Sequence, residues 1–115
     1  MKLLSTRTGS YLTGNEIADA VMHYGLVLTR DHHVDVVNIP FLAGEGVVAR
    51  VELVIGWLID TASVARESAS DELVEVDTIV GLYSRAASLR AVKGHGFTER
   101  EIADLQWPRF ADEEF

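Results

Sequence analysis

Two runs rich in valine and isoleucine, residues 34–41 and 47–59, flank the turn Gly44-Glu45-Gly46. Such runs on either side of a short glycine-containing turn are typical of a β-hairpin. Pro40 has no amide hydrogen, so we expect the first arm to lie at an edge of the sheet or to end there. Gly56 is expected to mark a bend or bulge in the second arm. The chain is therefore expected to build an antiparallel sheet on this hairpin.

Both faces of the hairpin are apolar. Side chains alternate between the two faces of a strand, yet Val36 and Val37 stand side by side in the first arm. Val54 and Ile55 do the same in the second arm. A hairpin in a small domain normally needs only one apolar face, so either helices cover both sides of the sheet or a second subunit covers one. We expect a homodimer that packs face to face, because Pro40 blunts the edge of the sheet.

Two similar nine-residue segments, 12–20 and 97–105, predict helix starts near the two ends of the chain. Thr13 and Thr98 are placed to cap the first turns, and in each segment a glutamate three residues later can reach back to the threonine amide. In the first helix the apolar residues recur at helical spacing: Ile17, Val21, Tyr24 and Leu28. The second segment predicts a short C-terminal helix, which Pro108 stops.

A further long helix is predicted to follow Asp77 as its N-cap and to end at Gly94. Its apolar residues keep a helical spacing: Ile79, Leu82, Ala86 and Leu89. Weaker patterns predict short strands at residues 2–6 and 73–76, and a loop or frayed strand end at 63–71. The predicted fold class is α+β, in which a small antiparallel sheet built on the hairpin (about residues 34–59) packs against two longer helices and a short C-terminal helix. Residues 1–108 are expected to form a single domain, and residues 109–115 an acidic aromatic C-terminal tail.

Composition narrows the classes of function. The chain has 115 residues, a net charge of −8 and no cysteine. Negative charge opposes binding to nucleic-acid phosphates, and a chain without cysteine has neither disulfides nor thiolate metal ligands. The longest apolar run, residues 53–59, is far shorter than the roughly 20 residues of a membrane span. With no signal peptide visible, we expect a cytoplasmic protein that binds no nucleic acid, membrane or cofactor.

Two short motifs resemble parts of known families. The pattern Thr-x-x-Glu-Ile-Ala, at Thr13 and again at Thr98, resembles the opening of the first helix in helix-turn-helix DNA-binding domains, which implies DNA binding. Neither copy is followed by a glycine-led turn and a recognition helix, and Pro108 ends the second. The net negative charge also opposes DNA binding. Two locally optimised helix caps account for both copies.

The segment Asp31-His32-His33 resembles the signature of the DHH phosphoesterases, which implies a two-metal site. With Asp35 it brings two imidazoles and two carboxylates within five residues, and all four are types that bind metal. The further aspartates and histidines of those enzymes are absent from this sequence. Adjacent histidines in an extended segment also point in opposite directions. We therefore interpret these residues as a polar loop and expect the chain to bind no metal. The weak candidate for a metal site is the set Asp31, His32, His33 and Asp35.

No serine stands in a Gly-x-Ser-x-Gly setting, and neither glycine pair continues into a phosphate-binding loop. We therefore expect a non-catalytic protein-interaction or accessory module that self-associates. A protein partner would use the apolar hairpin face or the C-terminal tail. The alternative is a small-molecule-binding domain or modest enzyme with a pocket between the first helix and the sheet. The candidate ligand-binding residues there are His23, Tyr24, His32, Asn38 and Trp57.

Overall fold

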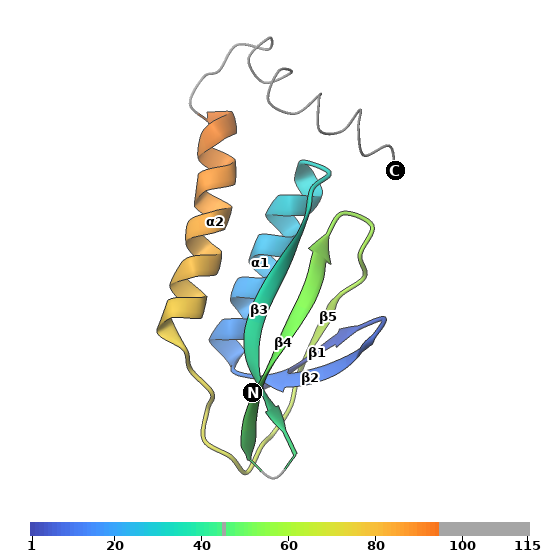
Figure 1. Ribbon diagram of the computed structural model, residues 1–115, viewed down its shortest axis with the longest axis vertical. Helices are drawn as coiled ribbons and strands as arrows, with labels where there is room; N and C mark the ends of the chain where they lie inside the picture. Colours follow the sequence, from blue (N-terminus) through green and yellow to red (C-terminus); the bar gives the residue numbers. More distant parts are fainter. Residues whose placement is uncertain (45, 95–115) are drawn as a thin grey trace.

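The computed structural model describes residues 1–44 and 46–94 as an α+β arrangement (Figure 1). The elements are β1 (Lys2–Thr6), β2 (Gly9–Thr13), α1 (Asn15–Arg30), β3 (Val34–Ala43), β4 (Val47–Gly56), β5 (Ala62–Ala65) and α2 (Val76–Gly94). The strands form one antiparallel sheet in the order β4-β3-β2-β1-β5. The predicted fold class is confirmed. The expected C-terminal helix and the tail at 109–115 lie outside the described residues.

The β3–β4 hairpin is confirmed and runs in continuous register from the pair Val34 and Gly56 to the pair Ala43 and Val47. Its turn places Gly44 and Gly46 at φ values of 24° and 77°, a backbone conformation that residues with a Cβ rarely adopt. Gly56, with φ of 123°, ends the second arm three residues earlier than expected. Its carbonyl accepts a hydrogen bond from Ile59 N at 3.1 Å, which turns the chain toward β5.

The hydrophobic core lies between the sheet and α1, which runs beside β3 and β4 in Figure 1. The predicted stripe of α1 is confirmed, since Ile17, Val21, Tyr24 and Leu28 are all buried. Odd-numbered residues of the hairpin meet this stripe and are also buried: Val37, Ile39, Leu53 and Ile55. Helix α2 lies beside α1 and adds the buried side chains of Leu82 and Ala86. One face of the hairpin is thus covered by a helix.

The predicted capping role of Thr13 is wrong. Residues 9–13 form β2, which pairs with β1, and Thr13 is its last residue. Its buried hydroxyl donates to the Pro40 carbonyl of β3 at 2.8 Å and so ties two strands together. The N-cap of α1 is Gly14, which makes no side-chain capping bond. The Asn15 amide donates instead to the Glu72 carboxylate, which lies in the segment between β5 and α2.

Three smaller expectations also change. Residues 73–75 form no strand, and α2 begins at Val76 rather than after Asp77. Residues 62–65, expected to belong partly to a loop, form β5 and pair with β1. β3 continues past Pro40 and lies inside the sheet order, so the edge strand is β4. The proline is tolerated because β2 pairs with β3 only at Leu42, so the missing amide breaks no ladder bond.

The contact between Glu72 and the start of α1 predicts a pH-dependent loss of stability in Glu72→Gln. The Asn15 amide lowers the pKa of the Glu72 carboxyl below its ordinary value of 4.5, and the amino terminus, 3.1 Å away, adds to this effect. A lowered folded-state pKa means that the carboxylate stabilises the fold above its unfolded-state pKa. This stabilisation is lost as the pH falls through the lowered value.

Urea midpoints of the wild type and of Glu72→Gln should therefore differ at about pH 7 and converge toward about pH 3. A difference of the same size at both pH values would contradict this role of Glu72.

Candidate functional site

The face of the hairpin that points away from α1 is the first candidate surface. We call its exposed even-numbered side chains the outer face: Val34, Val36, Asn38, Val48, Arg50, Glu52 and Val54. Pro40, also even-numbered, is fully buried. Val36 and Val54 are direct register partners and are 47% and 50% exposed. Val34, on the same side of β3, is 40% exposed. These valines of the second apolar face inferred from the sequence are therefore largely exposed, whereas Pro40 on the same side is buried.

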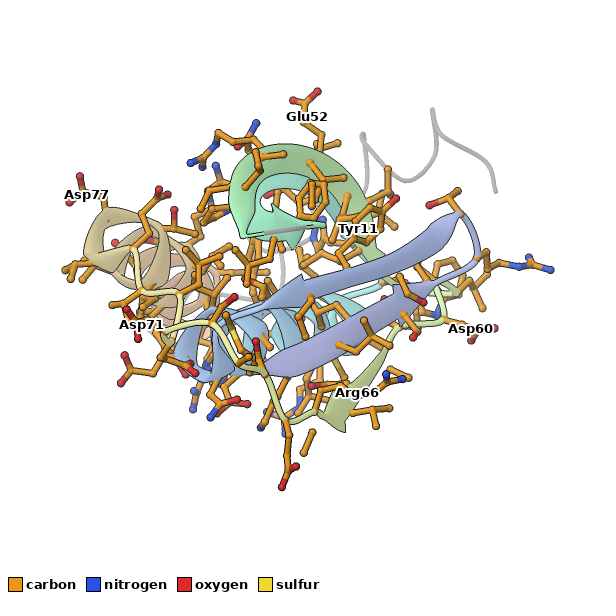
Figure 2. All side chains as sticks on the ribbon, turned by 90° about the horizontal axis from the view of Figure 1, so that it is seen from below. Tyr11, Glu52, Asp60, Arg66, Asp71 and Asp77 are labelled. Atoms are coloured by element: carbon orange, nitrogen blue, oxygen red, sulfur yellow. The ribbon has the colours of Figure 1, made fainter. Side chains whose placement is uncertain are left out.

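The middle of the outer face is polar. Arg50 donates through Nε to Asn38 Oδ1 at 2.5 Å, and through Nη1 to both carboxylate oxygens of Glu75, at 3.0 and 2.9 Å. The Arg50 guanidinium, helped by the Thr78 hydroxyl, holds the pKa of the Glu75 carboxyl below its usual value. Glu52 is the register partner of Asn38 and projects away from the molecule (Figure 2). The outer face thus carries charges of both signs between Val34, Val36 and Val54 at one end and Val48 at the other.

A second candidate is the cleft between α1, α2 and the start of β3. Tyr24 donates to Asp35 Oδ2 at 2.5 Å, and Arg85 Nη1 lies 3.2 Å from the same oxygen. Arg85 also donates to the Val36 carbonyl at 3.3 Å, which satisfies part of the β3 backbone that β2 does not reach. Burial, followed by the Asp35 carboxylate, raises the pKa of Tyr24 to about 12. The volume of the cleft is about 490 Å³.

The cleft offers limited chemistry. The Tyr24 phenol, with a pKa of about 12, is protonated at neutral pH, so it donates a hydrogen bond and does not act as a base. The Asp35 carboxylate already accepts from Tyr24 and Arg85. The charges of Asp35 and Arg85 neutralise each other, and the remaining polar groups of the lining include the hydroxyls of Ser84 and Ser88. The arrangement is that of a structural clamp between the two helices and the sheet.

The third candidate is a hollow of about 190 Å³ between α1 and the end of β4. It corresponds to the predicted position of a pocket between the first helix and the sheet. Its lining is mostly apolar and includes Met22, Leu26 and Ile59. The five predicted ligand-binding residues do not line it.

Those five residues do not meet at one place, although His32 and Trp57 contact each other. The His23 ring contacts Tyr83 of α2, with ring centroids 5.1 Å apart. His32 packs edge-on against Trp57 at 4.7 Å, and Asn38 lies on the outer face. Tyr24 is the residue of this set that lines the cleft. The structure therefore does not gather the five into one site.

The four metal candidates do not form one group either, although His33 and Asp35 both line the cleft. Asp31 is the C-cap of α1, and His32 turns toward Trp57 with φ of 59°. Asp35 is held by Tyr24 and Arg85. Within residues 1–44 and 46–94, no three His, Asp or Glu side chains are grouped so as to hold a metal ion.

Sequence reasoning missed the partners that complete these surfaces. Arg85 and Asp35 are 50 residues apart, and Glu75 and Arg50 are 25 apart. Neither pair leaves a local pattern in the sequence, since each depends on where α2 lies beside the sheet.

Comparison of the chain with protein-family models, curated proteins and solved structures finds no match. Neither of the two helices described is long and apolar enough to cross a membrane. The interpretation of function therefore depends on the surfaces themselves.

Proposed function

We propose that this chain is a non-catalytic protein-interaction module that self-associates through the β3–β4 hairpin. The observation that carries the proposal is the outer face, where Val34, Val36 and Val54 lie together and remain 40–50% exposed. Burying an aliphatic side chain completely stabilises a structure by about 1.5–3 kcal/mol. Because these valines are only half buried in the single chain, an interface that covers them would add a substantial part of that free energy. Contiguous apolar patches on small proteins commonly mark interaction sites.

The mixed charges support self-association over binding to a strongly charged partner. A symmetric dimer brings the same surface of two copies together, so the surface must be complementary to itself. Arg50 and Glu52 lie on the same face and have opposite signs, which meets this requirement.

The cleft at Tyr24 is the second candidate, as a small-molecule site. One observation favours it, namely that a phenol, a carboxylate and a guanidinium meet at the edge of an open hollow. It ranks second because these groups already satisfy one another.

Light scattering at micromolar concentration tests the proposal. We expect the wild type to have about twice the mass of one chain, because the dimer removes the valines from water. The double variant Val36→Ser/Val54→Ser should have the mass of a single chain. The matched control is Val64→Ser, since Val64 is 48% exposed but lies on β5 at the other end of the sheet. A monomeric wild type, or equal loss of the dimer in the control, would contradict the proposal.

A further inference from the structure

Strand β4 ends the sheet, and in the described part of the chain β3 is its sole neighbour. The direction of its backbone groups follows from one bond at its end, in which Trp57 N donates to His33 O at 3.0 Å. In an antiparallel pair, residues that exchange hydrogen bonds alternate with residues that do not. The odd-numbered residues of β4 therefore bond to β3. The even-numbered residues point their N–H and C=O groups to the free side: Val48, Arg50, Glu52 and Val54.

The side chains of β4 are arranged symmetrically about Val51. Arg50 and Glu52, of opposite charge, flank it. Further out, Ala49 matches Leu53. Beyond these, residues of one kind match on both sides: Val48 with Val54, and Val47 with Ile55. A strand with this pattern presents nearly the same chemistry when it is read in either direction, apart from the exchange of the two charges.

We propose that β4 pairs antiparallel with β4 of a second copy, about a two-fold axis that passes beside Val51. This inference rests on the proposed self-association but places the contact at the edge of β4, where Val54 and Val48 are the outer-face valines that meet the partner. Arg50 then lies opposite Glu52 of the partner subunit, and Val48 opposite Val54 of the partner subunit. The free N–H and C=O groups of both strands bond to each other, and the two sheets become one continuous sheet.

The charges select this register. A shift of one copy by two residues places Glu52 opposite its own counterpart, or Arg50 opposite its own, and directly opposed like charges destabilise a sheet. A shift by one residue places bonding groups opposite non-bonding ones. Arg50 can take part although it already binds Asn38 and Glu75, because a guanidinium has five N–H donors and these contacts use four.

The position of Pro40 removes the reason for expecting face-to-face packing. The proline lies in β3, which is not the edge strand, and β4 contains no proline. Charged residues on an edge strand also serve to prevent pairing. If Arg50 and Glu52 instead prevented pairing, β4 would stay unpaired at every protein concentration.

The variant Val51→Cys tests the register directly, because the chain has no other cysteine. Residues directly opposite in a non-bonded pair have Cα atoms about 4.5 Å apart, which is within the range of a disulfide. Mild oxidation should therefore convert this variant to a covalent dimer that a reductant reverses. The control is Glu52→Cys, whose two copies are displaced along the strands beyond the roughly 7 Å limit and should cross-link at least about tenfold more slowly. Circular dichroism establishes that both variants are folded.

The outcomes separate the two proposals. If the wild type is a dimer but Val36→Cys on the outer face cross-links faster than Val51→Cys, face packing replaces edge pairing while self-association stands. If the wild type is a monomer, both proposals fail. As a second measurement, Glu52→Arg should weaken the dimer about tenfold at low salt and less at high salt, since salt screens the repulsion from Arg50 of the partner subunit. An unchanged or salt-independent dissociation constant would overturn the register.

Discussion

Gly14→Ala is expected to destabilise the fold by about 3 kcal/mol, the upper end of the usual cost of forcing extra atoms into a packed site. A Cβ at this position would overlap the Leu73 carbonyl oxygen and lie 2.8 Å from the Leu73 carbonyl carbon. Both are backbone atoms, so the collision is not relieved by a side-chain rotation. The segment before α2 would have to move away from the start of α1, and the bond between Asn15 and Glu72 would be lost with it.

The matched control is Gly81→Ala in α2. No atom lies within 4 Å of a Cβ added at Gly81, and alanine is favoured over glycine in a helix by about 0.5–1 kcal/mol. Urea unfolding should therefore show a lower midpoint for Gly14→Ala and a higher one for Gly81→Ala. Equal midpoints for the two variants would contradict the close contact between residue 73 and the start of α1.

Ile39→Ala is expected to cost about 2–5 kcal/mol, because it leaves a cavity where a completely buried side chain meets α1. The matched variant on the same strand is Val36→Ala, on the outer face and 47% exposed. It should change the stability of the single chain by less than about 0.5 kcal/mol. Because Val36 lies on β3 and not on the paired edge, it should also leave the dimer nearly unchanged, whereas packing through the outer face would weaken the dimer. Urea unfolding at high dilution and light scattering at higher concentration measure the two effects separately. Comparable loss of stability in both variants would show that the outer face is part of the core.

The elements predicted well from the sequence are those with local causes. The β3–β4 hairpin follows from two aliphatic runs and glycines that accept positive φ values. The buried stripe of α1 follows from helical spacing. Thr13 shows where such reasoning fails, since the same Thr-x-x-Glu pattern that suits a helix cap also allows a strand end whose hydroxyl bonds to Pro40. That choice is made by the pairing of β1 with β2, which is a tertiary contact.

Of the candidate surfaces, the sequence predicted the outer face but neither the cleft nor the free edge of the sheet. The outer face could be inferred because alternation along a strand is a local property, and its valines are exposed as expected for an uncovered face. The cleft could not be inferred, because Asp35 meets Arg85 only through the position of α2. The position of β4 at the edge of the sheet could not be inferred either. The hairpin pattern predicts two paired strands, but which of them ends the sheet depends on β2, and β2 joins β3 at a single residue pair.

The most direct test of self-association through the hairpin is the concentration dependence of the backbone amide signals in ¹⁵N-correlated NMR spectra. On dilution from a dimer to a monomer, we predict shifts for amides of the hairpin, above all at Val48, Glu52 and Val54. The amides of β1 and β5, at the other end of the sheet, should stay unchanged. Spectra that do not change with concentration while the mass remains that of a single chain, or shifts confined to α2, would contradict the account.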